Sequence, residues 1–383
     1  MVIGLKDVAK LFGITIVACC AAFVCTLFLS YNIDLVAIEG EIAQDIRAMY
    51  DAQVMMGRVV AGVSGGCLIA TSVVMLLFYI KNYVDTHGKE LGILKALGYS
   101  DMNIARHFRV FGLAVFIGCA IGYVAGWLYL PTFYKKQNIE LMPALEPKFH
   151  LGLLFAIVAA PTIVLAAISV LFAYAKLKTP VLDLLKERCE FKAGKGRKEK
   201  DVEKFAADVP FLKDLSAVTL KSKKALAFFV AFSAFCFSAM VQMAFSMNAL
   251  ASETFAGMIL TIGLILAYVT LFLSLSGVVK GNMKTIAIMR AFGYDDGVCR
   301  RSIFGAYRPI AVIGFVIGTL YQFGLLKFMM KVVFAKIDGA PQYNFDFKAF
   351  FVTIVLFAAS YELSIYLYAL RIRKISVKDI MSE

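Results

Sequence analysis

Eight runs of about twenty predominantly apolar residues constrain the fold of this chain more than any other feature. An α-helix needs about 20 such residues to cross the hydrocarbon core of a bilayer. The 383 residues are 61% hydrophobic and 17% charged, whereas soluble domains are roughly 45–50% apolar and about 25% charged. This composition excludes a soluble enzyme and a disordered protein. We therefore expect an all-α polytopic membrane protein.

The eight predicted spans are separated by segments of different charge, and this difference predicts their orientation. The spans are predicted at residues 11–31, 59–80, 110–130, 151–174, 225–247, 255–279, 309–326 and 350–370. Of the 40 Lys and Arg residues, 31 lie in the termini and loops of one side and nine lie on the other. Because Lys and Arg concentrate in cytoplasmic loops, both termini are predicted to be cytoplasmic. The net charge of +13 therefore does not indicate nucleic-acid binding.

An internal duplication relates the two halves of the chain. Residues 90–101, ELGILKALGYSD, resemble residues 285–296, TIAIMRAFGYDD, at a separation of 195 positions. Two further segments recur at a separation of 196 positions. Gly118 and Gly122 correspond to Gly314 and Gly318, and the segment that begins at Pro180 corresponds to the one that begins at Ser376. The agreement of three separated segments predicts two homologous halves with four spans each.

The duplication predicts a first four-helix module at residues 1–190, a charged cytoplasmic linker at 191–210 and a second four-helix module at 211–383. Short amphipathic stretches at 2–10 and 211–224 precede the spans of each module. We expect them to lie as elbow helices on the cytoplasmic leaflet. The linker is rich in charge and poor in apolar residues, which is typical of a flexible connection.

The external segment between the first two spans, 32–58, is longer than its counterpart at 248–254. It mixes apolar residues with carboxylates. Two interpretations remain open for it. It is either a helical extension of the two spans that contacts a partner or lipid headgroups, or a plain connector.

The repeated loop after the second span of each half predicts a short amphipathic helix of about two turns. Its apolar stripe contains Leu91, Leu94 and Leu97, with the copies Ile286, Met289 and Phe292. Gly98 and Gly293 are expected to end these helices, and Ser100 and Asp295 are suited to cap the helices that follow. An apolar stripe repeated on the cytoplasmic side favours a docking surface for a partner. The alternative is a solvated loop helix that only caps two spans.

The chain carries no signature of catalytic chemistry of its own. It has no GxxxxGK[ST] phosphate-binding motif. The eight cysteines lie in spans or predicted cytoplasmic segments, and the three histidines lie far apart. Neither a disulfide framework nor a metal site is indicated. No catalytic residue, metal or cofactor is therefore expected in this chain.

This pattern resembles the FtsX-like permease module of ATP-binding cassette (ABC) transporters of the MacB and LolC/LolE type. In that family the segment after the second span reads much like KELGILKALGYS, residues 89–100 here, and a Pro-containing segment follows the fourth span, as at Pro180. The resemblance covers nearly the whole chain. It implies two tandem four-helix modules in a bacterial cytoplasmic membrane. The chain differs in joining both modules and in lacking a large external domain, since segment 32–58 has only 27 residues.

The resemblance implies that the two repeated helices are coupling helices seated in clefts of a cytoplasmic ABC ATPase, a dimer for each permease chain. That ATPase would bind ATP and Mg²⁺. An accessory extracytoplasmic or membrane protein could supply the missing external domain. The residues implied to dock the ATPase are Glu90, Leu91, Leu94, Lys95, Leu97, Gly98, Tyr99, Ile286, Met289, Arg290, Phe292, Gly293 and Tyr294.

Two features inside the spans are further candidates. Small residues four positions apart allow close helix packing in lipid, and they occur here as Gly118, Gly122, Gly126, Gly314 and Gly318. Glu362 is a carboxylate inside a span, where an isolated charge costs about 2.5–3.5 kcal/mol. It either contacts a substrate or gate, or lies near the cytoplasmic end and pairs with Arg371 or Arg373.

These observations predict the permease subunit of an ABC transporter that exports or extracts a hydrophobic or amphipathic compound, such as a lipid, peptide or antimicrobial. The alternative is a subunit that relays ATPase motion to an extracytoplasmic protein without transport. An ion-driven transporter is disfavoured, because such proteins usually need broken helices and polar clusters at the membrane midplane.

Overall fold

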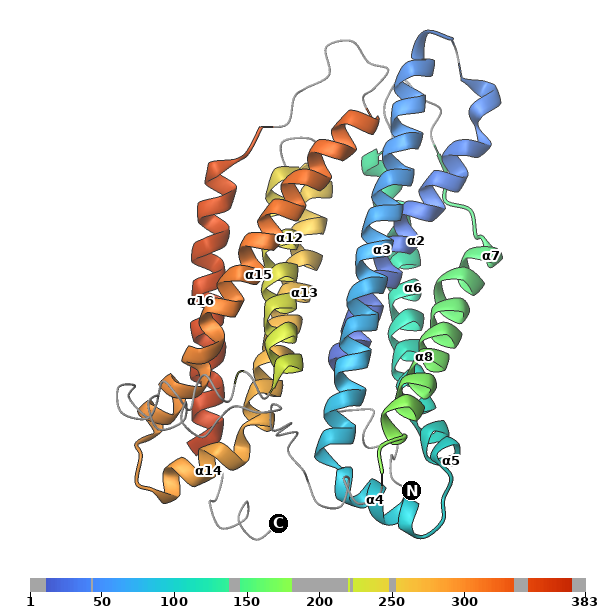
Figure 1. Cartoon of the computed structure of the whole chain (residues 1–383). Helices are drawn as coiled ribbons and strands as arrows, with labels where there is room; N and C mark the ends of the chain where they lie inside the picture. The colour runs from blue at the N-terminus through green and yellow to red at the C-terminus, as the bar shows by residue number, and fades with distance from the viewer. Residues whose placement is uncertain are drawn as a thin grey trace. The chain divides into compact units, whose positions relative to one another are not determined.

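The computed structural model describes residues 12–42, 44–137, 145–180, 220, 223–247, 253–333 and 344–373. All regular elements within these residues are helices, which confirms the all-α prediction (Figure 1). The predicted elbow helix at 2–10, most of the one at 211–224, the linker at 191–210 and the repeat from Ser376 lie outside the described residues.

The described part of the chain contains seven helices that are long and apolar enough to cross a membrane. They are Phe12–Ala37, Asp101–Gln137, Leu151–Leu177, Lys224–Ser246, Leu260–Val279, Gly297–Phe328 and Phe347–Tyr368. They cover seven of the eight predicted spans. The remaining span, 59–80, lies within α3 (Arg47–Thr86), a helix of 40 residues. The chain is a multi-pass membrane protein, and the count of eight crossings with cytoplasmic termini stays a prediction.

The chain divides into two compact units, residues 1–185 with 323–345 and residues 186–322 with 346–383. The first unit contains the helices α2 (Phe12–Ala37), α3, α4 (Gly88–Ala96), α5 (Asp101–Arg106), α6 (Val110–Gln137), α7 (Leu151–Leu154) and α8 (Ala160–Leu177). In this unit α2 packs between α6 and α3, and α8 packs against both of those helices.

The fourth span of the first unit is one helix with a π-helical turn at Phe155–Ala159, which joins α7 to α8. Pro161 lies at the start of α8. A proline has no N–H to donate and its ring clashes with the carbonyl four residues earlier. The wider π turn accommodates this local disruption while the helix continues.

The second unit contains α12 (Lys224–Met247), α13 (Glu253–Gly281), α14 (Met283–Ala291), α15 (Asp296–Val333), to residue 322, and α16 (Phe347–Arg373). In this unit α12 packs against α13 and α16. Buried polar side chains also join α12 to α15. Ser238 Oγ lies 2.9 Å from Thr319 Oγ1, and Gln242 Nε2 donates to the same oxygen at 2.8 Å. Such bonds between helices stabilise packing where lipid offers no competing partner.

The same glycine-mediated helix crossing occurs in both units. A Cβ at Gly118 of α6 would lie 2.4 Å from the Thr15 carbonyl oxygen of α2. A Cβ at Gly314 of α15 would lie 2.1 Å from the Ala231 carbonyl oxygen of α12. Both approaches are too close for any side chain.

The register of the two crossings agrees with the duplication. The glycines are separated by 196 positions, while Thr15 and Ala231 are separated by 216. The difference of 20 equals the difference in length between external segments 32–58 and 248–254, of 27 and seven residues. The two units therefore pack their first and third spans in the same way.

Most of segment 32–58 in the first unit is helical and continues α2 and α3, as one of the two interpretations predicted. After α2, two short 3₁₀ turns, Glu39–Glu41 and Gln44–Ile46, lead into α3. Asn32 Nδ2 donates to the Val54 carbonyl at 3.0 Å, and the Tyr50 hydroxyl donates to the Leu35 carbonyl at 3.1 Å. Burial, with the carboxylates of Glu39 and Asp51, raises the pKa of Tyr50, so its hydroxyl stays protonated and donates.

Candidate coupling helices

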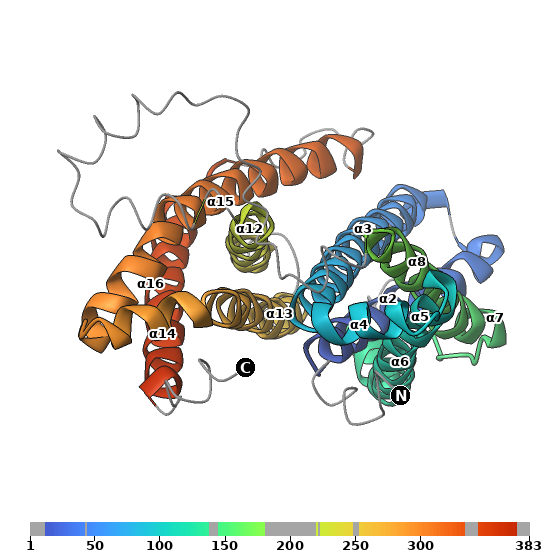
Figure 2. The ribbon, with the colours of Figure 1, turned by 60° about the horizontal axis from the view of Figure 1, so that its bottom comes forward.

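The two predicted loop helices are present as α4 and α14, each nine residues long. α4 follows α3 after the single residue His87, and α14 follows α13 after the single residue Asn282. Figure 2 is turned so that the α4 end of the first unit comes forward, and it shows α4 and α5 across that end. Each helix is thus directly connected to the second long helix of its unit.

Both helices end in the same glycine motif. Gly98 has a φ of 90° and Gly293 a φ of 83°. The Gly98 N–H donates to the Lys95 carbonyl at 3.0 Å, and the Tyr99 N–H donates to the Leu94 carbonyl at 3.2 Å. The pair is repeated from Gly293 to Arg290 and from Tyr294 to Met289. These bonds define a Schellman motif, whose left-handed residue is usually glycine.

The residues after the glycines start the next helix, as predicted. Ser100 Oγ accepts a hydrogen bond from the Asn103 N–H at 3.3 Å at the start of α5. Asp295 Oδ2 accepts one from the Gly297 N–H at 3.0 Å at the start of α15. Each loop therefore consists of a short helix, a tight turn and the capped start of the next helix, and hydrogen bonds fix the backbone of the turn.

The apolar residues of these helices do not form one exposed stripe, contrary to the prediction. Leu91, Ile286 and Met289 are buried in their own units, with exposures of 0%, 5% and 3%. The physical reason is helix geometry. Residues three apart differ by about 60° around the axis, so a stripe from position 91 to 97 turns through about 120°.

The exposed apolar side chains occupy equivalent positions in the two units. Leu97 and Phe292 follow the last residue of each helix and are 71% and 79% exposed. Ile93 and Ile288 are 52% and 48% exposed. We call these four residues the tip residues. Sequence reasoning had included Leu97 and Phe292 but had missed Ile93 and Ile288, although both isoleucines belong to the repeat.

The remaining residues of the predicted docking set, apart from Lys95, also divide into exposed and half-buried positions. Glu90, Gly98 and Tyr99 of the first unit are exposed, as is Gly293 of the second, whereas Leu94, Arg290 and Tyr294 are half-buried. The exposed residues accompany the tip residues on the surface. The half-buried ones lie between that surface and the interior of each unit.

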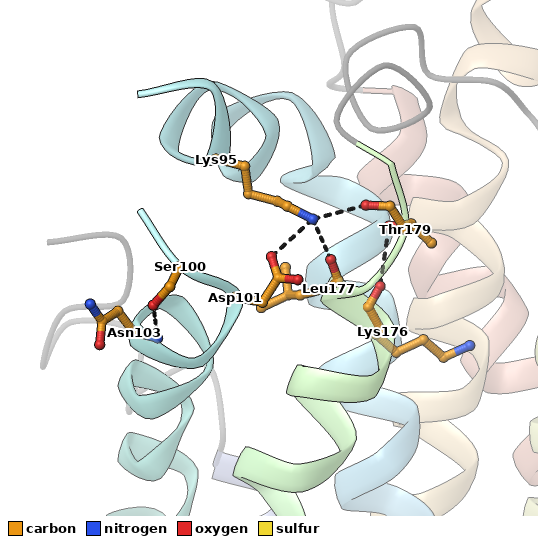
Figure 3. Close-up of polar contacts among 7 residues, drawn as sticks. All are labelled: Lys95, Ser100, Asp101, Asn103, Lys176, Leu177 and Thr179. Carbon is orange, nitrogen blue, oxygen red and sulfur yellow. Dashed lines mark hydrogen bonds and ion pairs between the residues drawn. The ribbon is translucent and has the colours of Figure 1, made fainter. Parts of the chain in front are cut away.

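Lys95 points into the first unit instead of toward a partner (Figure 3). Its Nζ donates to the carbonyls of Leu177 at 2.6 Å and Thr179 at 2.9 Å, and it forms an ion pair with Asp101 Oδ1 at 2.9 Å. Its side chain is only 11% exposed. A cation at the carboxyl end of α8 is favoured by the helix dipole. Lys95 thus connects α4 to the end of α8 and to the start of α5.

The second unit uses a different lysine at the junction between α13 and α14. Lys223 Nζ donates to the Gly281 carbonyl and to Asn282 Oδ1, the latter at 2.9 Å. Asn282 is fully buried, and its Nδ2 donates to the Val278 carbonyl at 2.8 Å. A lysine thus fixes the loop region of each unit, Lys95 from within α4 and Lys223 from the residue before α12.

Glu362 forms an ion pair with Arg308 of α15, a partner that the sequence analysis had not named. Arg371 lies nine residues further along α16, about 13 Å at 1.5 Å per residue, while Arg308 lies on a neighbouring helix. The Arg308 and Glu362 side chains are 55% and 57% exposed. Two charges of opposite sign therefore lie together at the surface of the second unit.

One buried polar cluster of the first unit was not predicted. Asp34, only 3% exposed, accepts hydrogen bonds from the Tyr134 hydroxyl at 2.6 Å and the Lys148 N–H at 3.2 Å. His150 Nε2 lies 2.8 Å from its other carboxylate oxygen. The cluster fixes the carboxyl-terminal ends of α2 and α6 to the start of α7. Among the described residues, no group of three or more His, Cys, Asp or Glu is placed to hold a metal ion.

Comparison with known protein families gives one match, found twice in the chain. The model of the FtsX-like permease C-terminal domain matches residues 62–180 and 257–377. Each matched stretch begins in the second long helix of a unit and includes α4 or α14. Together the two stretches cover more than half of the chain. Neither a curated protein nor a solved structure gives a significant match.

Proposed function

The chain belongs to the FtsX-like permease family, and from this premise we propose that it couples ATP hydrolysis by a separate ATPase to export or extraction of a hydrophobic or amphipathic compound. The family makes the chain the membrane subunit of an ABC transporter, and such permeases generally work with a cytoplasmic ABC ATPase. In our proposal, one ATPase subunit docks on α4 and a second docks on α14. ATP and Mg²⁺ are held by the ATPase.

The observation that carries this proposal is the exposure of equivalent tip residues on both loop helices. Leu97 and Phe292 are large apolar side chains, each more than 70% exposed, on loops that the charge distribution assigns to the cytoplasm. No lipid tail covers them there. Exposed apolar groups of this kind mark surfaces for protein partners. Their occurrence twice in one chain fits two equal clefts of an ATPase dimer.

The contacts of α4 support transmission of motion into the membrane. A partner that displaces α4 pulls α3 through the chain, because only His87 separates the two helices. It also pulls the end of α8 through the hydrogen bonds of Lys95 and the start of α5 through Asp101. The bundle would then move by rigid-body shifts of packed helices, a common form of conformational change.

The length of α3 favours an alternative function, in which the chain relays ATPase motion without transport. At 40 residues α3 is about 60 Å long, twice the roughly 30 Å of a bilayer core. It runs from α4 to the external extension without interruption. This single rod suits a subunit that relays ATPase motion to an extracytoplasmic partner. Stimulation of ATP hydrolysis by an added amphiphile in reconstituted vesicles would favour transport over relay.

Charged substitutions of the tip residues test the docking proposal. An unpaired charge buried in an apolar interface costs several kcal/mol, and about 1.4 kcal/mol corresponds to tenfold in affinity. The variant Leu97→Glu with Phe292→Glu should therefore insert in the membrane but lose the ATPase by about 100-fold or more on affinity purification. The control Leu97→Met with Phe292→Leu keeps both sites apolar and should retain it. Retention of the ATPase by the Glu variant at wild-type yield would refute docking at these helices.

A further inference from the structure

The crossing of α15 and α16 in the second unit brings four polar side chains together. Arg308 and Glu362 form the ion pair described above. Tyr307 and Tyr361 are their neighbours in sequence and are buried, with exposures of 0% and 5%. Among the residues that the structure describes, the Tyr361 hydroxyl has no hydrogen-bond partner, and the charges of Arg308 and Glu362 are close enough to act on it. We call these four residues the polar crossing.

The first unit provides an internal control for this arrangement. The positions 196 earlier are Phe111, Gly112, Leu165 and Ala166. The equivalence holds in space, because a Cβ at Gly112 would lie 2.5 Å from the Cβ of Ala166. The fourth spans also start at equivalent positions, Leu151 and Phe347. The same crossing is therefore built without a polar side chain in the first unit, and the module does not need the ion pair to pack.

The polar crossing lies near one end of the membrane-spanning segment. Arg308 directly precedes the predicted span 309–326, and Glu362 lies six residues, about 9 Å, before the end of the apolar helix at Tyr368. The charge distribution places this end on the cytoplasmic side. Tyr366, one turn beyond Glu362, is 55% exposed, and aromatic residues are enriched at this depth of a bilayer.

The surface beside the ion pair is apolar. Leu363 and Val312 are 54% and 57% exposed. A ligand for this surface must satisfy a cation and an anion a few ångströms apart and must also cover apolar side chains. An amphiphile with a phosphate and an ammonium group in its headgroup has all of these properties. Guanidinium groups bind phosphate through paired hydrogen bonds, and a carboxylate can accept from an ammonium.

We propose that the polar crossing binds the zwitterionic headgroup of an amphiphile from the cytoplasmic leaflet, with Arg308 on the phosphate and Glu362 on the ammonium. The Tyr361 hydroxyl then donates to the headgroup and gains the partner that it lacks in the free chain. The acyl chains lie against the apolar residues beside the pair. This inference rests on the proposed function, since it names the class of compound that the transporter would move. It also assigns binding of the headgroup to the second unit alone.

Binding of defined lipids to the purified full-length chain tests the assignment. Native mass spectrometry in detergent would compare phosphatidylethanolamine, phosphatidylglycerol, which lacks the ammonium, and diacylglycerol, which lacks both charges. The wild-type chain should prefer phosphatidylethanolamine to diacylglycerol by about tenfold or more, the factor that 1.4 kcal/mol of binding free energy gives. The matched variant Leu165→Met changes the position equivalent to Tyr361 in the first unit while keeping its volume, and it should leave this preference unchanged.

Two substitutions that each remove one charge separate the roles of Arg308 and Glu362. Glu362→Gln should bind phosphatidylethanolamine and phosphatidylglycerol equally, because only the ammonium site is lost. Arg308→Gln should lose the preference of both lipids over diacylglycerol. Tyr361→Phe should weaken phosphatidylethanolamine binding without unfolding the chain, since Phe fills the same space.

Equal lipid preferences in wild type and in all three variants would overturn the proposal. So would loss of self-association or of a co-purifying membrane protein in the Gln variants at unchanged lipid binding, because the pair would then belong to a protein interface. The assay contains no ATPase. A failure of ATPase docking at α4 and α14 would therefore leave the lipid result standing, and the two outcomes remain distinguishable.

Discussion

At the scale of single residues, Lys95 shows how the sequence of a loop helix serves two purposes. Its neighbours on α4 include exposed apolar side chains, yet its own ammonium lies among oxygen atoms of Leu177, Thr179 and Asp101. Alternation of exposed and inward residues over a few positions follows from the 3.6-residue turn. One face of α4 is free for a partner, and the other is bonded to the unit that a partner would move.

Removal of the Lys95 charge should loosen α4 without removing its apolar surface. Hydrogen bonds from a charged group contribute about 1.5–3 kcal/mol, and Lys95→Met keeps the length of the side chain. We expect amide hydrogen exchange in α4 to accelerate by about 10–100-fold, at 1.4 kcal/mol per factor of ten. Glu90→Gln, which also removes a charge at an exposed position of the same helix, is the control. Unchanged exchange in the Lys95 variant would show that these bonds do not hold α4.

At the scale of helices, the glycine positions decide how closely the first and third spans approach. A Cβ at Gly122 of α6 would lie 2.2 Å from the Cys19 carbonyl oxygen, and one at Gly318 of α15 would lie 2.5 Å from the Phe235 carbonyl oxygen. In both cases the obstacle is backbone, which cannot rotate away as a side chain can. Gly126 is less restricted, because its nearest neighbour is the Thr26 side chain at 3.0 Å.

Alanine at Gly122 should therefore separate α6 from α2. Overpacking of this kind costs about 1–3 kcal/mol, and thermal unfolding of the detergent-solubilised chain should shift to lower temperature. Gly62→Ala in α3 is the control, because no atom lies within 4 Å of its added Cβ and alanine favours the helix by about 0.5–1 kcal/mol. Equal melting temperatures for the two variants would contradict the close crossing.

The sequence predicted the helices well and their contacts poorly. The described residues of each predicted span are helical, because apolar length is a local property. However, α3 and α15 extend well beyond spans 59–80 and 309–326. Their polar ends remain helical outside the apolar segment. The glycine stops and the caps at Ser100 and Asp295 were predictable because they depend on adjacent residues.

The candidate site was predicted only in part, for a physical reason. Which side of α4 faces inward depends on the contacts of Lys95 with the end of α8 and with Asp101 at the start of α5. The sequence of α4 alone does not contain that information. The partner of Glu362 comes from α15, 54 positions earlier, and the buried partners of Asp34 lie more than 90 positions away. Pairings over such distances leave no local pattern in a single sequence.

At the scale of the whole chain, the two units share a fold but differ in polar content. Equivalent glycines form equivalent crossings, and equivalent tip residues are exposed at 97 and 292. The external extension and the Asp34 cluster occur in the first unit, and the polar crossing occurs in the second. A duplicated permease in one chain can thus keep two equal surfaces for an ATPase dimer while each unit acquires a separate task.

The central claim is that one chain docks an ATPase at each of its two loop helices, and photo-crosslinking in membranes of the host tests it most directly. Benzoylphenylalanine would replace Leu97 or Phe292 in turn, with Leu128 of α6, 72% exposed but inside a span, as the control. The account predicts a light-dependent adduct with the ATPase at position 97 and also at position 292, and none at 128. Absence of the ATPase adduct at either loop position, with the chain correctly inserted, would contradict the account.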